Sequence, residues 1–537
     1  MEEITTDILV IGSGLAGIMA ALEAERFGVK VLLLGKFSIG MGTNTSLANG
    51  AFAAANSHLS KEEHLRITLE SGRGLNHHPL VKTLVENGPD AIERLKEYGI
   101  PLVERGNEYR IDRPEQSPQL PGVLLVRGLL ERLKGSSIQL LPGFIIFDLV
   151  VEAGEARGAF GFYRDGRPCF VRSKAVILAT GGGGAVYGRN DNQRSILGDG
   201  YSLALRADLP LFDLEFVQFF PLVLAEPKLS TFILLPPYPR EMKLTNEKGD
   251  DLLEILGVED NLNRATLTHR DRLSIALYET SQKGDIYADL TRIPGDEWDR
   301  FPLNFLRKSK FPFHEKPFLV APAVHFFMGG AEINERGRTA LPGLYAAGET
   351  VWGLHGANRL GGNALTECAV FGIIAGHAAA EESLSKKSIG TSTDASHDKL
   401  RRKWEKRARE YTKQKRGVFD HPGDLLKDLK RAAWRYLGPV REASSLEEGL
   451  GQLKSIEERI QRVFPTTVND LFRKKDLENI ALLLEALLRG SLLRKESRGS
   501  FYRSDFPDQD DSLWLKNTCY RLKEGKFEIT HRPIRIS

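Results

Sequence analysis

Short apolar runs on either side of a glycine-rich turn open the chain. Residues 7–11 (DILVI) predict a buried strand, the alanine-rich residues 17–27 predict a helix, and residues 29–34 predict a second buried strand. A strand, a glycine turn, a helix and a strand in this order are typical of a βαβ unit. The sequence therefore predicts an α/β protein whose parallel sheet begins at the N-terminus.

The pattern changes several times further along the chain. Leucines interleaved with charges predict helices over residues 61–98, and short apolar segments with turns predict strands over residues 138–178. Residues 222–321 are rich in proline and aromatic residues, which indicates an inserted α+β domain. Apolar, glycine-containing sequence returns over residues 322–376, and residues 399–493 are charged and strongly helical in pattern. Several domains are therefore expected.

Composition excludes some classes of protein. The formal net charge is only +3 over 537 residues, so no nucleic-acid partner is expected. Cys169, Cys368 and Cys519 lie far apart, so neither a disulfide framework nor a metal or iron–sulfur site is expected within this chain. The acidic start lacks the features of a secretory signal, and no run of about 18 apolar residues occurs. We predict a cytoplasmic protein that reaches a membrane only through a partner.

The turn after the first strand has the sequence Gly12-Ser-Gly14-Leu-Ala-Gly17. A GxGxxG between a strand and a helix is the context in which this motif binds a dinucleotide, whereas glycine turns elsewhere are merely structural. Gly12 permits the tight turn, Gly14 lets the backbone approach a pyrophosphate, and Gly17 lets the helix pack on the strand. The helix start at Leu15 and Ala16 offers N–H groups to the phosphates. We therefore predict a dinucleotide cofactor here.

The second strand ends in Leu34-Gly35-Lys36, without the acidic residue that holds the ribose in NAD sites. Three later segments strengthen the assignment. Ala179-Thr180-Gly181 ends a buried strand with small residues, Gly198-Asp199-Gly200 opens a helix, and residues 343–349 (GLYAAGE) end another strand in glycine and acid.

Residues 343–349 and residues 356–365 (GANRLGGNAL) resemble the second FAD signature of one known family. This family comprises the flavoprotein subunits of fumarate reductase and succinate dehydrogenase and the L-aspartate oxidases. Residues 71–76 and 497–507 also resemble its motifs. The resemblance implies an FAD cofactor, with Glu349 on a ribose and residues 363–365 at the flavin edge. The other cofactor contacts that it implies are Lys36, Asn44, Thr45, Asn49, Gly50, Ala179, Thr180, Gly181, Asp199, Gly348, His355, Asn363, Ala364 and Leu365.

The resemblance also implies a fold. A Rossmann-like FAD-binding domain is expected to be interrupted by an α+β capping domain and followed by a C-terminal helical domain. The corresponding boundaries are residues 1–222 and 322–385 for the FAD-binding domain, 223–321 for the cap, 398–496 for the helical domain and 497–537 for the tail.

One departure from the family concerns Asn44. In the membrane-complex enzymes a histidine at the matching place bonds covalently to the flavin, and an amide cannot form that bond. We therefore expect non-covalent FAD.

Three residues match the catalytic motifs of the family. Arg270 resembles the arginine that transfers a proton, His325 the histidine that binds a substrate carboxylate, and Arg359 the arginine that clamps a carboxylate above the flavin. Taken singly, a histidine in an apolar run is commonly a core residue and an Arg-Asp pair a surface ion pair. All three occur in the same order along the chain as in the family. The resemblance therefore implies hydride exchange with a C–C bond next to a carboxylate.

The substrate loop departs from the family pattern. Phe220 stands where the family has a carboxylate-binding histidine, and Leu222 where it has a threonine. Residues 234–240 (LLPPYPR) lack the family's threonine and glutamate ligands. A phenyl ring cannot compensate a buried carboxylate, so a small-molecule substrate other than unmodified fumarate is expected. Tyr238, Arg240 and His269 are candidate replacement ligands.

Two alternatives remain open from the sequence. One is L-aspartate oxidase, which the residues around Arg359 fit. The other is a flavin-bearing electron-transfer subunit without a substrate of its own. Where electrons leave through an iron–sulfur cluster, that cluster is expected in another chain, because this chain lacks the cysteines for one, so an iron–sulfur electron-transfer subunit is a candidate partner.

Overall fold

The computed structural model describes residues 2–114, 117, 119–227, 233–258, 261–300, 302–386, 398–399, 402, 405–406, 409 and 420–534. Most of residues 400–419, the expected start of the helical domain, lies outside the described residues.

The largest sheet is built around the βαβ unit. Its strand order is β6-β2-β1-β9-β8-β7, with β16 also paired to β9. β1, β2, β6, β9 and β16 pair in parallel, whereas β7, β8 and β9 pair antiparallel. The carboxyl ends of β1, β2 and β16 therefore share one edge, where ligands bind in open α/β sheets. The strands are β1 Glu2–Ile11, β2 Val31–Gly35, β6 Gln139–Pro142, β7 Phe144–Glu152, β8 Glu155–Tyr163, β9 Pro168–Leu178 and β16 Leu344–Ala346.

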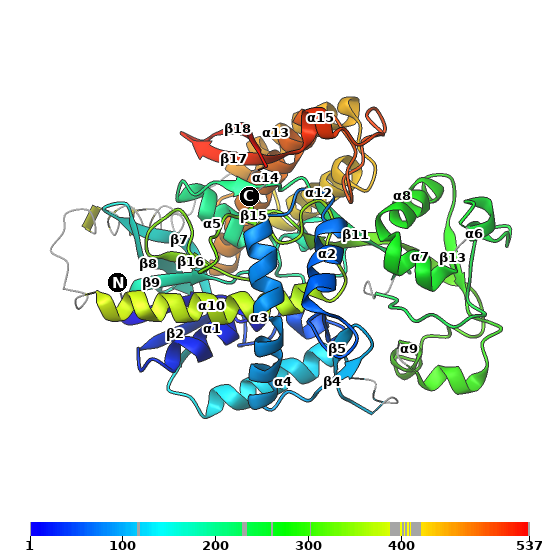
Figure 1. Ribbon diagram of the computed structural model, residues 1–537. Coiled ribbons are helices and arrows are strands. Elements are labelled where there is room, and N and C mark those ends of the chain that lie inside the picture. The colour runs from blue at the N-terminus through cyan, green and yellow to red at the C-terminus, as the bar shows by residue number, and fades with distance from the viewer. Residues whose placement is uncertain are drawn as a thin grey trace.

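Helices α1 and α10 pack side by side next to this sheet (Figure 1). The close approach requires glycine on α10, because a Cβ at Gly372 would lie 2.6 Å from the Ala16 carbonyl oxygen and one at Gly376 2.3 Å from that of Ala20. The helices of this domain are α1 Leu15–Glu25, α2 Lys61–Ser71, α3 His78–Glu97, α4 Pro121–Lys134, α5 Asp199–Arg206 and α10 Asn363–Ser385, with short 3₁₀ turns η1 Asn44–Leu47 and η2 Gly184–Val186.

Two small sheets complete this body. One has the order β3-β5-β4 and lies near η1 and α4, and the other has the order β15-β10-β17-β18 and joins the C-terminal hairpin to the nucleotide-binding part. Their strands are β3 Ala51–Phe52, β4 Leu102–Arg105, β5 Glu108–Ile111, β10 Leu211–Phe212, β15 Gly330–Ala331, β17 Lys516–Lys523 and β18 Lys526–Pro533.

The inserted segment forms a separate lobe, coloured green at the right of Figure 1. It has its own hydrophobic core, which begins at Phe220 and ends at Ala323. Its sheet has the order β11-β14-β13-β12, so the chain enters through β11 and leaves through the adjacent strand β14. Its elements are β11 Val217–Leu224, β12 Lys243–Thr245, α6 Leu252–Ile255, α7 Leu262–Thr268, α8 Arg270–Ser281, β13 Ile286–Asp289, η3 Gly295–Asp299, α9 Leu303–Lys308 and β14 Phe318–Phe327.

In the described part of the C-terminal bundle, the long helices α12, α13 and α14 pack on one another. Helix α14 is fixed at its start by a capping box between Thr467 and Asp470, and it packs against α5 of the nucleotide-binding domain. The helices are α12 Pro422–Leu437, α13 Ala443–Gln461, α14 Val468–Leu493 and α15 Asp511–Trp514.

This architecture has the predicted fold class: an α/β body, an α+β insertion and a helical bundle. The exact domain boundaries stay predictions; the expected boundary at residue 222 falls within β11. In the described part of the chain, no helix is both long and apolar enough to cross a membrane.

Candidate active site

A long cavity follows the carboxyl edge of the main sheet and extends to the cap. Its wall brings together residues from the first glycine turn, η1, the segment after β9, β14 and the segment before α10. The predicted site residues that line it are Gly12, Gly14, Leu15, Ala16, Lys36, Asn44, Thr45, Asn49, Ala179, Thr180, Gly181, Asp199, Arg270, His325, Gly348, Glu349, Arg359, Ala364 and Leu365.

Four predicted cofactor residues do not line this cavity. A Cβ at Gly17 would lie 1.9 Å from the Gly12 carbonyl oxygen, so Gly17 lets α1 pack on the turn behind the wall. Gly50 faces the side chain of Pro121. His355 is 2 % exposed and its Nε2 lies 2.8 Å from a carboxylate oxygen of Glu367. The amide of Asn363 is buried against His64 and Thr68. These four residues support the wall from behind.

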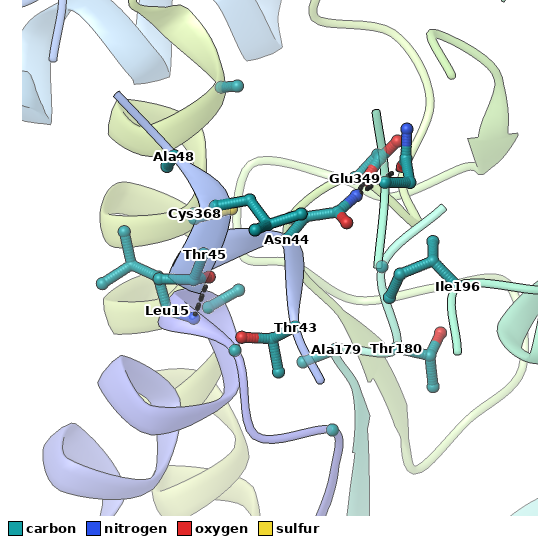
Figure 2. A pocket seen from close by; sticks show the side chains of 18 of the residues that line it. Leu15, Thr43, Asn44, Thr45, Ala48, Ala179, Thr180, Ile196, Glu349 and Cys368 are labelled. Atoms are coloured by element: carbon teal, nitrogen blue, oxygen red, sulfur yellow. Dashed lines mark hydrogen bonds between the residues drawn. The ribbon is translucent and has the colours of Figure 1, made fainter. Parts of the chain in front are cut away.

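The start of α1 forms one part of the floor. Its N-cap residue, Gly14, provides no side-chain cap, and the Leu15 N–H donates to Thr45 Oγ1 at 3.0 Å (Figure 2). A Cβ at Gly12 would lie 2.1 Å from the Ala179 carbonyl oxygen. The turn, the helix start and the end of β9 are therefore in close contact. This arrangement fits a pyrophosphate, because glycines leave room for it and the positive end of the helix dipole faces it.

Asn44 and Glu349 meet across the middle of the cavity. Figure 2 shows the Asn44 amide pointing toward the Glu349 carboxyl group, and Asn44 Nδ2 donates to Glu349 Oε2 at 3.4 Å and to Asn192 Oδ1 at 2.6 Å. The other oxygen of Glu349 accepts from the Phe327 N–H at 3.1 Å. Burial raises the pKa of Glu349 to about 7. Asn44 thus positions an acid at the place where the ribose contact is expected.

The end of the cavity near β2 contains a cluster of charges. Lys36 Nζ donates to Asp199 Oδ2 at 3.0 Å and to Asp476 at 3.1 Å, and Lys475 also donates to Asp199. Burial alone would raise the pKa of Asp199, but Lys36 and Lys475 hold it well below its ordinary value. Lys475 belongs to α14, so the C-terminal bundle contributes to the cofactor cavity.

The other end brings together Arg270, His325 and Arg359 from three segments. Arg359 Nη2 donates to Gln218 Oε1 at 3.0 Å, and its guanidinium carbon lies 4.6 Å from the centre of the Phe326 ring. Burial, and then the charge of Arg270, lower the pKa of Arg359 to about 9. Two like charges in a buried site favour the binding of an anion close to them.

His325 is paired with Asp191, which sequence reasoning did not identify. His325 Nδ1 lies 2.7 Å from Asp191 Oδ2, and the Asp191 side chain is 6 % exposed. Burial lowers the pKa of His325, and Arg359 and Arg270 act in the same direction while Asp191 opposes them. The imidazole is therefore neutral at neutral pH.

Phe220 is part of the wall at the cap end and lies close to both Arg270 and His325. Its ring centre lies 5.6 Å from that of His325 and 5.2 Å from the Arg270 guanidinium carbon. Ile233, Leu235 and Phe326 also line the cavity, so apolar side chains adjoin the charged groups at this end.

The candidate replacement ligands do not line the cavity. Tyr238 is buried and donates its hydroxyl hydrogen to the Leu234 carbonyl oxygen at 2.7 Å, whereas Arg240 and His269 are exposed. Leu222 is also buried away from the wall. The loss of the family's polar ligands is therefore not compensated by these residues.

Several lining residues were not predicted from the sequence. They lie in loops without a motif or on a distant helix, and no pattern in one sequence singles them out. They include Asp191, Asn192, Ser195 and Lys475.

Comparison with known proteins agrees with this geometry. Residues 7–365 match the model of the FAD binding domain, and residues 426–537 match that of the fumarate reductase flavoprotein C-terminal region. The chain belongs to the fumarate reductase flavoprotein family. It is an FAD-dependent oxidoreductase of this family, and FAD is its cofactor.

Three relatives illustrate the range of the family. A subunit of the CoM/CoB fumarate reductase of Methanothermobacter marburgensis is 31% identical, with 94% of each chain covered. The L-aspartate oxidase of Streptomyces coelicolor is 29% identical over 98% of this chain and 93% of its own. A solved quinol-fumarate reductase with menaquinol molecules is 27% identical, with a TM-score of 0.90 over 100% of this chain and 99% of that chain.

Proposed function

We propose that the protein exchanges hydride with the C–C bond next to the carboxylate of a monocarboxylic substrate that carries an apolar group. The observation that carries this proposal is that Phe220 lies close to both Arg270 and His325, where the family resemblance implies a second carboxylate ligand.

The three sequence-predicted catalytic residues have distinct roles in this proposal. Bound FAD supplies the hydride chemistry. Arg359 clamps the single carboxylate, since its planar guanidinium can donate two hydrogen bonds and its Nε has no partner among the described residues. Arg270 transfers the proton and polarises the double bond, and the Phe220 ring shields it from water. His325 contacts the remaining part of the substrate.

The apolar wall supports a change of substrate. A dicarboxylate leaving water needs a charged partner at each end, and the loss of one such partner costs about 2–5 kcal/mol. Phe220, Ile233 and Leu235 provide none. An enoate with an apolar substituent would instead gain from the contact with these side chains.

The test is anaerobic reoxidation of the reduced flavin. Crotonate and cinnamate should reoxidise it faster than fumarate does. Reoxidation by fumarate at a higher rate than by either enoate would contradict the proposal.

L-aspartate oxidase is the second candidate, favoured by the similarity to the Streptomyces coelicolor enzyme. Aspartate-dependent formation of hydrogen peroxide would select it. A third candidate is an electron-transfer subunit without its own substrate, and absence of reoxidation by every acid would favour that function.

We further propose that FAD is bound non-covalently and that the chain is one subunit of a complex with an iron–sulfur partner. Asn44 supports the first point, because its side-chain amide, which donates hydrogen bonds to Glu349 and Asn192, is not a nucleophile that could bond to the flavin. Acid precipitation should leave all the yellow flavin in the supernatant. Copurification of an iron–sulfur protein with the untagged chain tests the second point.

A further inference from the structure

Asp191 places a buried carboxylate in the substrate end of the cavity. The residue lies between η2 and α5, and its backbone N–H donates to the Val324 carbonyl oxygen at 3.1 Å. Its Oδ1 accepts from Asn192 Nδ2 at 3.1 Å, and its Oδ2 contacts His325 Nδ1 at 2.7 Å. Both oxygens are thereby fixed, and the carboxylate cannot turn away when a substrate enters.

The contact determines the tautomer of His325. A carboxylate only accepts hydrogen bonds, so Nδ1 carries the hydrogen and donates it to Asp191. In the neutral imidazole Nε2 is then an acceptor. His325 consequently cannot bind a second carboxylate unless it first takes up a proton.

The charged side chains around His325 carry a small net charge. The groups that interact with it are Asp191 from the segment before α5, Arg359 from the segment before α10 and Arg270 at the start of α8, while Phe220 on β11 is uncharged. Two guanidinium groups and one carboxylate leave a single net positive charge. This matches a monoanion and leaves a dianion uncompensated.

We propose that Asp191 is a specificity-determining residue that selects monocarboxylates over dicarboxylates. It does so by cancelling one arginine charge and by holding His325 as a neutral acceptor. This inference rests on the proposed function and names the residue that sets the charge of its substrate.

The test is a titration of the oxidised holoenzyme with butyrate, as the monocarboxylate probe, and succinate, as the dicarboxylate probe. Binding is measured from the change in the flavin absorption spectrum. In Asp191→Asn, the Kd of succinate should fall by about tenfold or more, because like charge next to a buried ligand is removed. The Kd of butyrate should change by no more than about threefold. Asp191→Ser, which also removes the charge, should give the same ratio if the Asn variant does not fold.

The pH dependence adds a second readout. In the wild type, succinate binding requires a proton on His325, so its Kd should rise about tenfold per pH unit above the pKa of this histidine. In Asp191→Asn the site carries two uncompensated positive charges, and the slope should fall well below this. A merely structural role of Asp191 would not alter the slope.

Asp271→Asn is the matched control. Asp271 also interacts electrostatically with Arg270, but it does not line the cavity. If Asp271→Asn shifts the ratio of the two Kd values as much as Asp191→Asn does, or if neither variant shifts it, the inference about Asp191 is wrong. If butyrate and crotonate fail to perturb the flavin in every variant, the proposed function itself fails.

Discussion

The two ends of the cavity differ in how their charged side chains are paired. Near β2, Lys36 and Lys475 compensate Asp199, and every one of these groups has an oppositely charged partner at hydrogen-bond distance. At the cap end, burial and then the charge of Arg270 lower the pKa of Arg359, and both guanidinium groups pack on phenyl rings instead. The first end is complete without a substrate charge, whereas the second attracts an anion. The charged side chains at the cofactor end are thus already paired with one another, whereas those at the cap end can bind an anion.

The largest expected effect comes from Arg359→Lys at the cap end. Lysine keeps the charge but loses the planar fork, so kcat/KM with the preferred enoate should fall by about 10²–10³-fold. The flavin content should stay unchanged, because the cofactor end is untouched. Steady-state kinetics and flavin absorbance check both. A loss of flavin together with activity would mean that the two ends are not independent.

The second-largest expected effect is a pH-dependent loss of stability caused by Glu349, which lies between the two ends of the cavity. Its pKa rises on folding to about 7 from an ordinary 4.5. A raised carboxyl pKa contributes stability that is complete below about pH 4.5 and is lost as the pH rises through 7. The loss should approach about 3 kcal/mol in the flavin-free protein. Urea unfolding at several pH values should show this loss, and Glu349→Gln should remove it.

Phe220→His should reduce the difference between the two ends of the cavity, because it replaces an apolar side chain at the cap end with a polar one. A second imidazole beside His325 gives a dicarboxylate a hydrogen-bonding partner, so kcat/KM for fumarate should rise by about tenfold. Leu222→His is the matched control, because Leu222 is on the same strand but buried away from the wall. An equal gain in both variants would show that the position of Phe220 is not what matters.

The smallest effect is expected for Lys475→Met. It removes one of two cations from Asp199, and Lys36 remains. The affinity of the flavin-free protein for FAD should fall several-fold, about 1 kcal/mol. Fluorescence quenching of added FAD measures it. No change in affinity would exclude α14 from a role in cofactor binding.

The sequence was more informative about the cofactor end than about the cap end. GxGxxG between β1 and α1 and the GLYAAGE strand are local patterns, so these segments and the family resemblance that they carry predicted the fold class, FAD and many of the lining residues. The partner of His325 could not be predicted, because Asp191 is 134 residues away and the contact depends on how a loop meets β14.

Lys475 illustrates the same limit at the cofactor end. It reads as one more charge on an exposed helix, and only the packing of α14 on α5 buries it beside Asp199. Conversely, Gly17, Gly50, His355 and Asn363 belong to recognisable motifs, but they support the wall without lining the cavity. A motif identifies a segment, whereas tertiary packing decides which of its side chains are presented.

The route by which the chain enters and leaves the cap has an evolutionary consequence. Phe220 is on the outgoing strand and His325 on the returning one, and the two strands are paired, with Phe220 opposite Ala323. The positions proposed to contact the substrate therefore lie at the neck of the insertion, outside the glycine turns proposed to hold the nucleotide. Sequence change in the inserted lobe, or its replacement, can therefore alter the substrate while the FAD-binding domain is inherited unchanged.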